Sequence, residues 1–118
     1  MRVLSLTVPT PRRRVPRRAQ RYSVRWAVTE INGMPTRDTW MVDVSCMGAR
    51  LDTTSALNPN MPVKFTLILP DGDRELMVNG RVIWMRPVFY SHGRFHQGIQ
   101  FYGINWDLDS LAKQESSG

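Results

Sequence analysis

Apolar and polar residues alternate along most of the chain beyond residue 21. The alternation is clearest over residues 22–28, 63–69 and 75–86, and shorter stretches of the same kind cover residues 40–45, 49–53 and 95–102. A period of two is typical of β-strands that bury one face. The pattern therefore predicts about six strands. Only residues 107–114 have apolar positions at helical spacing, after a start signal at Asn105 or Asp107.

Short turn signals separate these strands, which favours antiparallel pairing. Asn32-Gly33 is a typical two-residue hairpin turn, and a second turn follows at residues 70–73. Closing the strands into a small barrel removes exposed sheet edges. Gly80 and Gly98 lie inside predicted strands, where glycine often marks a bulge or a sharp bend. We therefore expect an all-β fold, a six-stranded antiparallel β-barrel with a short C-terminal helix.

Residues 43–48 form the most informative segment for function. Asp43 and Ser45 are two residues apart on a predicted strand, so we expect both on its outer face. Gly48 follows at the strand end, where a missing side chain leaves room for a ligand near the backbone. A carboxylate can accept two hydrogen bonds from the N1 and N2 edge of guanine, and a hydroxyl can hold the same base. The alternative is an Asp-Ser turn that only ends a strand. The positions expected to face the core are Trp40, Val42 and Val44.

The net charge of +6 is unevenly distributed. Residues 1–25 contain eight arginines and no acidic residue, whereas residues 26–118 contain 8 basic and 10 acidic residues, so the two regions have charges of +8 and −2. Of the 16 cationic residues, 14 are arginine, whose planar set of donors suits phosphates and the guanine edge. This bias indicates an anionic partner such as a nucleotide, a nucleic acid or a phosphoprotein.

Residues 1–16 are predicted to form a flexible arm, of which residues 1–11 should be mobile. Pro9, Pro11 and Pro16 oppose a helix, and the arginines at residues 12–14 repel one another. The predicted body begins at residue 17 and ends at residue 114, and residues 115–118 are expected to be a disordered tail.

An R-x-x-x-R pair precedes the first strand directly. Its members are Arg17 and Arg21, with Arg18 beside the first. Such pairs arise easily in an arginine-rich segment, and the alternative is a solvated basic tail. The order along the chain favours a ligand site, because the segment from Asp43 to Gly48 follows one hairpin later.

Together the two motifs resemble those of the PilZ domain family. The resembling stretches cover residues 17–24, 43–51, 80–84 and 98–101 in the family's order, and the resemblance extends over residues 17–114. It implies a barrel of the split-barrel type and a bacterial receptor for cyclic di-GMP. The arginines would bind phosphates and guanine, and the later motif would hold a guanine on the barrel surface. The residues that the resemblance assigns to the ligand are Arg17, Arg18, Arg21, Asp43, Ser45, Gly48 and Trp84.

The resemblance also suggests how the receptor would signal. Ligand phosphates would draw the arginine segment onto the face that carries Asp43 and Ser45, and the N-terminus would become ordered. A downstream protein effector would then detect the change. Trp84 has an alternative role as part of the core, because it shares a predicted strand face with Val78 and Val82.

Other function classes have less support in the residues. The chain has no readable pair of catalytic carboxylates, Gly-rich phosphate loop or Ser-His-Asp order, and Cys46 and the two histidines lack partners at useful spacing, so we expect no enzyme, metal or cofactor. No segment approaches the roughly 18 apolar residues of a membrane span, which favours a cytoplasmic protein without membrane insertion. A small barrel that binds single-stranded nucleic acid through the arginine arm is the alternative, although the slightly acidic body disfavours nucleic acid.

Overall fold

The computed structural model describes residues 19–70 and 74–117, with side chains described up to residue 115. The predictions for the arm, including Arg17 and Arg18, lie outside these residues. The described elements follow the predicted order, with one additional two-residue strand. They are β1 (Tyr22–Ile31), β2 (Met34–Pro35), β3 (Trp40–Val44), β4 (Gly48–Thr53), β5 (Pro62–Ile68), β6 (Glu75–Pro87), β7 (Phe95–Phe101) and α1 (Trp106–Ser117).

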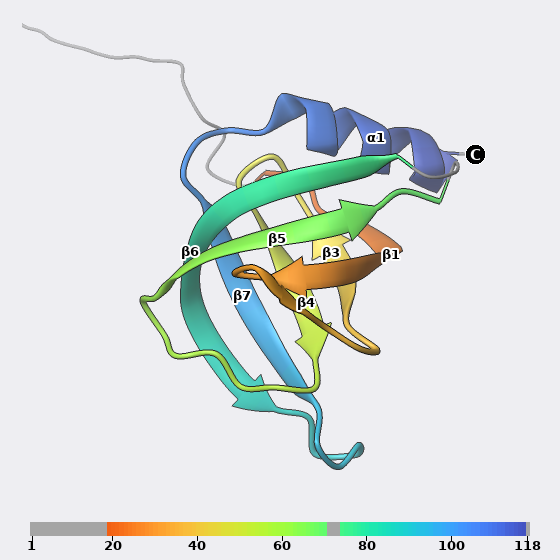
Figure 1. The fold of residues 1–118 in the computed structure, drawn as a ribbon. Coiled ribbons are helices and arrows are strands. Elements are labelled where there is room, and N and C mark those ends of the chain that lie inside the picture. Colours follow the sequence, from red (N-terminus) through yellow and green to blue (C-terminus); the bar gives the residue numbers. More distant parts are fainter. Residues whose placement is uncertain (1–18, 71–73, 118) are drawn as a thin grey trace, which may run out of the picture.

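The strands form a closed antiparallel barrel (Figure 1). Their order is β2-β1-β3-β4-β7-β6-β5, and pairing of β1 with β5 closes the barrel. Thus six strands form the wall, and β2 only extends the hairpin that begins at β1. The prediction of a six-stranded antiparallel barrel with a C-terminal helix is confirmed.

Local sequence explains most of the wall. Val63, Phe65 and Leu67 on β5 are all buried, as their alternation predicts. Asn32 and Gly33 both have positive φ values, of 52° and 81°, which is the backbone that a two-residue hairpin turn requires. These features place the core inside the barrel and leave the alternate positions of the strands on its outer surface.

The predicted face of β3 is wrong in part. Met41 and Val44 are fully buried, whereas Trp40 and Val42 are only half-buried. The cause is a shift of register in the pairing of β3 with both of its neighbours. In the pairing with β4 the shift lies between Met41 and Asp43, and in the pairing with β1 it lies between Ser23 and Trp26 of β1. A bulge adds one residue to one strand and reverses the faces of the residues that follow. Strict period two therefore fails at this point.

Helix α1 covers one end of the barrel (Figure 1). Its Leu108 and Ala112 are buried in the core cluster, and the Asn105 side-chain oxygen accepts a hydrogen bond of 2.9 Å from the Leu108 N–H. Asn105 is therefore the N-cap of α1, and it is one of the two residues that the sequence predicts as the start of the helix. The helix continues past the predicted boundary at residue 114, because the indole N–H of Trp26 donates to the Glu115 carboxylate at 2.8 Å.

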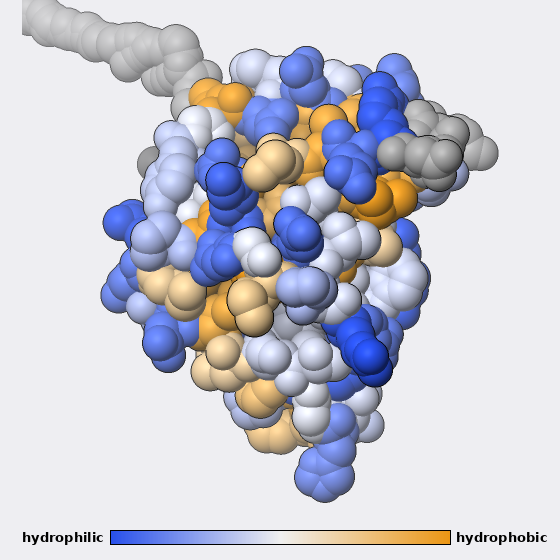
Figure 2. Space-filling view, viewed as in Figure 1, coloured by the Kyte–Doolittle hydropathy of each residue, from blue (hydrophilic) through white to orange (hydrophobic). Residues whose placement is uncertain are grey.

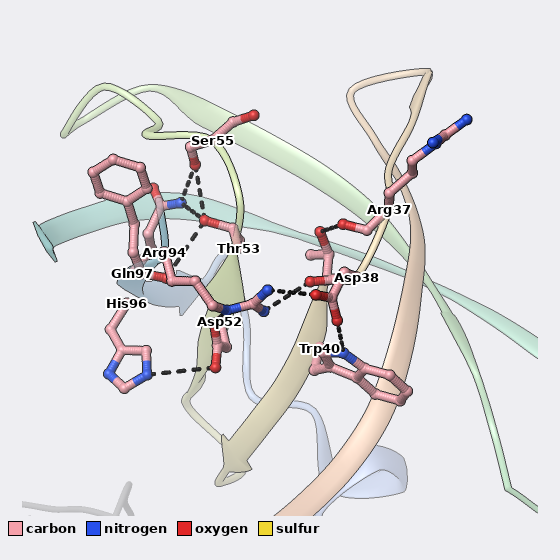
Figure 3. A network of polar contacts seen from close by, with 11 residues as sticks. Arg37, Asp38, Trp40, Asp52, Thr53, Ser55, Arg94, His96 and Gln97 are labelled. Carbon is pink, nitrogen blue, oxygen red and sulfur yellow. Dashed lines mark hydrogen bonds and ion pairs between the residues drawn. The ribbon is translucent and has the colours of Figure 1, made fainter. Parts of the chain in front are cut away.

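A polar network links the strands at the other end of the barrel (Figure 3). Arg94 donates to Asp52 Oδ1 and to Asp38 Oδ2, both at 2.7 Å. Trp40 donates its indole N–H to Asp38 at 3.0 Å, and this bond together with the charge of Arg94 lowers the pKa of Asp38. Close by, the buried Gln97 donates to the backbone of Ser55 at 2.9 Å. The network fixes the loop after β2 against β4 and β7.

Candidate functional site

The turn from β3 to β4 carries the motif that the sequence singles out. The Ser45 N–H donates to the Gly48 carbonyl at 2.8 Å, which closes the turn. Two further backbone bonds hold it from outside: Phe101 N–H donates to Met47 O at 2.9 Å, and Asn105 N–H donates to Cys46 O at 2.8 Å. The turn is thus attached to the end of β7 and to the segment that leads into α1.

Gly48 is required by close approach of the backbone. A Cβ at this position would lie 2.3 Å from the carbonyl oxygen of Ile99 on β7. Because that oxygen belongs to the main chain of a paired strand, it cannot move aside without distorting the barrel. The glycine therefore has a structural role as well as the predicted role of leaving room for a ligand.

Ser45 is less accessible than the sequence predicts. Its exposed fraction is only 1%, and its hydroxyl oxygen accepts a hydrogen bond of 3.1 Å from the Met47 N–H. The expectation that Ser45 stands on the outer face beside Asp43 is wrong, because the strand ends at Val44 and Ser45 already belongs to the turn. Ser45 nevertheless contributes to the wall of a surface hollow.

Asp43 lies between two arginines. The Arg21 Nε donates to Asp43 Oδ1 at 2.9 Å, and Arg50 Nη2 lies 3.8 Å from the other carboxylate oxygen. The Arg50 Nε is buried without a hydrogen-bond partner among the described residues. Half of the Arg21 side chain is exposed, against 20% of Asp43. The arginine that precedes β1 and the carboxylate on β3 are therefore brought together, as their order along the chain suggests.

Trp84 lies outside the core. The pairing of β6 with β7 shifts between Val82 and Trp84, so the face shared by Val78 and Val82 does not continue to Trp84. Its indole lies over Gly98, where a Cβ would be 2.2 Å from the indole nitrogen. The guanidinium of Arg86 lies 4.6 Å from the centre of a Trp84 ring. The alternative of Trp84 as a core residue is therefore wrong.

These features surround one open hollow of about 550 Å³ on the barrel wall. Its wall combines a guanidinium, a hydroxyl, an indole and the bare backbone of two glycines. With the carboxylate of Asp43 beside Arg21, the hollow offers acceptors for a base edge, a cation for phosphate and a flat apolar surface for a ring. The wall residues that carry this chemistry are Arg21, Ser45, Gly48, Trp84, Gly98 and Gln100.

The sequence analysis does not identify all of the residues around the hollow. Gln100 faces Gly48 across β4 and β7, and Ile83 forms part of the wall. Arg50, which the sequence analysis does not assign to the ligand, approaches Asp43. Detecting these residues requires the order of the strands. The sequence signal for Arg50, two residues after Gly48 on the following strand, indicates its position but not its partner.

Comparison with known proteins shows the family of the chain. A family model described as the PilZ domain matches residues 11–113 of the chain. The chain belongs to the PilZ domain family. PilZ domains are receptors for cyclic di-GMP, and they bind and regulate rather than catalyse. No curated protein matches the chain.

One solved structure has a fold that is similar to this one. It is described as Bacillus subtilis inhibitor of motility (MotI/DgrA), and it superposes with a TM-score of 0.63 at 15% sequence identity. The alignment covers 92% of this chain and 54% of that protein, so the present chain spans about half of its length. Within the described residues, no helix is both long and apolar enough to cross a membrane. The same part of the chain shows no group of three or more side chains suited to holding a metal ion.

Proposed function

We propose that the chain binds cyclic di-GMP in the hollow beside the β3–β4 turn. The observation that carries the proposal is the convergence of Arg21, Ser45, Gly48 and Trp84 on one hollow, with Asp43 bonded to Arg21 at its border. These residues come from three separate segments of the chain: the residue before β1, residues 43–48, and β6. Membership of the PilZ family, whose ligand is cyclic di-GMP, supports the same assignment.

The guanine of the ligand is recognised by Asp43 and by the turn. The carboxylate accepts from the guanine N1–H and N2–H, and adenine has no matching pair of donors on that edge. Ser45 supports the turn from within and presents its hydroxyl at the wall. The missing side chain of Gly48 lets the base approach the backbone.

Arg21 changes its contacts when the ligand binds. Arg21 donates to one carboxylate oxygen of Asp43, so a guanine bound to Asp43 competes with Arg21 for that oxygen. Arg21, together with Arg17 and Arg18, then contacts the ligand phosphates and the guanine O6 and N7. Arg50, 3.8 Å from the other carboxylate oxygen, continues to compensate the charge of Asp43.

Trp84 provides a flat surface for the ligand. Its indole is half-buried and held over Gly98 on one side, so the ring does not have to be ordered when the ligand binds. Stacking of a base on an aromatic side chain contributes about 1–3 kcal/mol. Replacement of Trp84 by alanine should weaken binding within that range.

Binding is signalled through the N-terminus. The arginine segment joins the barrel at β1, next to Asp43, and closes over the ligand. A change of this kind needs no chemistry, only a difference in the order of one segment between two states. We expect the backbone amides of residues 17–22 to gain order when cyclic di-GMP is added, whereas residues near Phe65 and Phe101 stay unchanged.

Calorimetry tests the ligand assignment. Titration with cyclic di-GMP should give saturable binding, and GMP and a short single-stranded RNA are the controls. The affinity for a ligand with two phosphates should change little with salt, whereas binding to a nucleic acid strand falls steeply with salt. Tight RNA binding with a steep salt dependence, and no heat with cyclic di-GMP, would support the nucleic-acid alternative instead.

Hydrogen exchange of the free and bound chain tests the signalling step. Replacement of Arg17 and Arg21 together by alanine should abolish both binding and ordering. The matched control replaces Arg12 and Arg13, which should cost only a screened electrostatic contribution. Equal effects of the two double variants would show that a diffuse basic tail, and not the R-x-x-x-R pair, attracts the ligand.

A further inference from the structure

A second surface of the barrel exposes several large apolar side chains and lies outside the hollow described above. It is a groove of about 510 Å³ between β6 and the segment that leads from β7 into α1. Its floor includes the buried Val78 and Phe101. Four large side chains of its wall are exposed, with exposed fractions between 41% and 65%: Met77, Tyr102, Ile104 and Trp106. Figure 2 shows hydrophobic residues that reach the surface at the end of the barrel covered by α1.

Such a cluster needs an explanation. Single exposed apolar residues are normal on a protein surface, but a contiguous group lining a groove is typical of an interaction site. No ligand-binding role explains it, because the four side chains lie outside the hollow that contains Arg21 and Trp84. The groove therefore favours an occupant with apolar side chains.

The groove is connected to the place where the described chain begins. Ala19 lines the hollow of the candidate site together with Met47 and Gln100. A smaller depression continues from Met47 and Gln100 to Tyr102 and Ile104, which also line the groove. Two residues along a strand correspond to about 7 Å, so the groove begins one such step beyond Gln100.

The chain that precedes Ala19 contains a segment of matching chemistry. Residues 3–8 read Val-Leu-Ser-Leu-Thr-Val, in which apolar and β-branched residues predominate, as in an extended strand. Ten residues, 9–18, separate this segment from Ala19 and can span up to about 33 Å when extended. The segment can thus reach a groove that starts beside the candidate site.

Charge supports the same pairing. Asp107 lines the groove, Asp109 lies in the same first turn of α1, and Glu75 precedes Met77 on β6. On the β6 side, Lys64 pairs with Asn79 through the backbone, and the exposed Arg81 follows two residues later. Arginines flank the apolar segment on both sides, at residue 2 and at residues 12–14. The acidic first turn of α1 at the groove therefore complements the arginines that flank the segment.

We propose that the groove between β6 and α1 binds residues 3–8 of the same chain. Covalent attachment gives the segment an effective concentration in the millimolar range, so that even a weak apolar contact is occupied. Residues 9–18 then form a strap that leads from the groove to the candidate site and includes Arg17 and Arg18. The proposal differs from the expectation from the sequence that residues 1–11 are mobile.

Nuclear magnetic resonance of the full chain tests the proposal without cyclic di-GMP, so its outcome is independent of the ligand assignment. The test variant is Leu4→Ser with Leu6→Ser, and the matched control is Ser5→Ala with Thr7→Ala. The test variant should shift the Trp106 indole N–H and the methyl groups of Met77 and Ile104, and the order of residues 3–8 should fall. The control should leave these signals in place.

Two further measurements separate the possible occupants. Met77→Ser, on the groove side, should release residues 3–8 as the arm variant does, while the core signals of Phe65 stay fixed. The groove signals should not change on dilution, because the contact lies within one chain. The proposal is overturned if the signals of the groove residues do not shift when Leu4 and Leu6 are replaced. Signals that change with protein concentration overturn it as well, since a second copy would then be the occupant.

Discussion

Replacement of Asp43 by alanine separates ligand recognition from stability. The carboxylate accepts two hydrogen bonds from guanine in the proposed complex, and loss of a good base contact costs about 1–3 kcal/mol. The affinity for cyclic di-GMP should therefore fall about 5-fold to 150-fold. Asp43→Asn retains one acceptor and should lose less than the alanine variant.

The same substitution should change the free energy of unfolding only slightly. Arg21 and Arg50, the two cations beside Asp43, are 51% and 40% exposed, so water screens them after the carboxylate is removed. Ion pairs of this exposure contribute roughly 0.2–1 kcal/mol. The melting temperature should thus fall by no more than a few degrees, while the affinity changes much more.

Calorimetry for affinity and circular dichroism for melting together check this prediction. Glu30→Ala is a suitable control, because Glu30 is an exposed acid on β1 whose removal changes the net charge equally. The control should leave both quantities near their original values. An unchanged affinity in Asp43→Ala, or a barrel that no longer folds, would refute the assignment of Asp43 to the guanine edge.

Three further predictions concern the fold. Gly48→Ala places a Cβ 2.3 Å from the Ile99 carbonyl oxygen, so chemical denaturation should show a loss of about 1–3 kcal/mol, and a neutral result would mean that the strands can separate freely there. Burial, and to a smaller extent the charge of Asp109, raises the pKa of the Cys46 thiol, so a thiol reagent should label Cys46 only after unfolding; rapid labelling of the folded chain would contradict its burial. The pKa of Asp38 is lowered in the folded chain, so its contribution is present above the unfolded pKa and is lost as the pH falls through the lower folded value. Lowering the pH below about 4 should accordingly reduce the melting temperature of the original chain more than that of Asp38→Asn. Equal losses of melting temperature in the two proteins would exclude this contribution.

The fold could be predicted from the sequence where side-chain pattern alone decides it. The alternation of Val63, Phe65 and Leu67 and the Asn32-Gly33 turn both correspond directly to the observed wall and hairpin. These features are local, because a strand that buries one face must alternate and a tight turn requires positive φ values.

The errors arise where pairing between strands decides the outcome. Bulges in β3 and β6 reverse the expected faces, so that Trp84 leaves the core and Val42 becomes half-exposed. Ser45 is buried because the backbone turns immediately after Val44. A bulge depends on the register with neighbouring strands, and nothing in a single strand's alternation reports that register.

The candidate site was predictable in its members more than in its geometry. Arg21 and Asp43 are far apart along the chain, yet the family resemblance pairs them and the structure bonds them at 2.9 Å. Arg50 and Gln100 enter the surroundings only through the order β3-β4-β7. That order is a property of the closed barrel, which residue spacing does not specify.

Mapping of cyclic di-GMP onto the chain by nuclear magnetic resonance tests the central claim most directly. Stepwise addition of the ligand should shift the Trp84 indole N–H and the amides of Arg21, Gly48 and Gly98, with saturation at a common concentration. The signals of the β6–β7 hairpin tip at residues 88–93 should remain in place. Absence of saturable shifts, or shifts centred on the hairpin tip instead of the hollow, would contradict the proposed binding of cyclic di-GMP beside the β3–β4 turn.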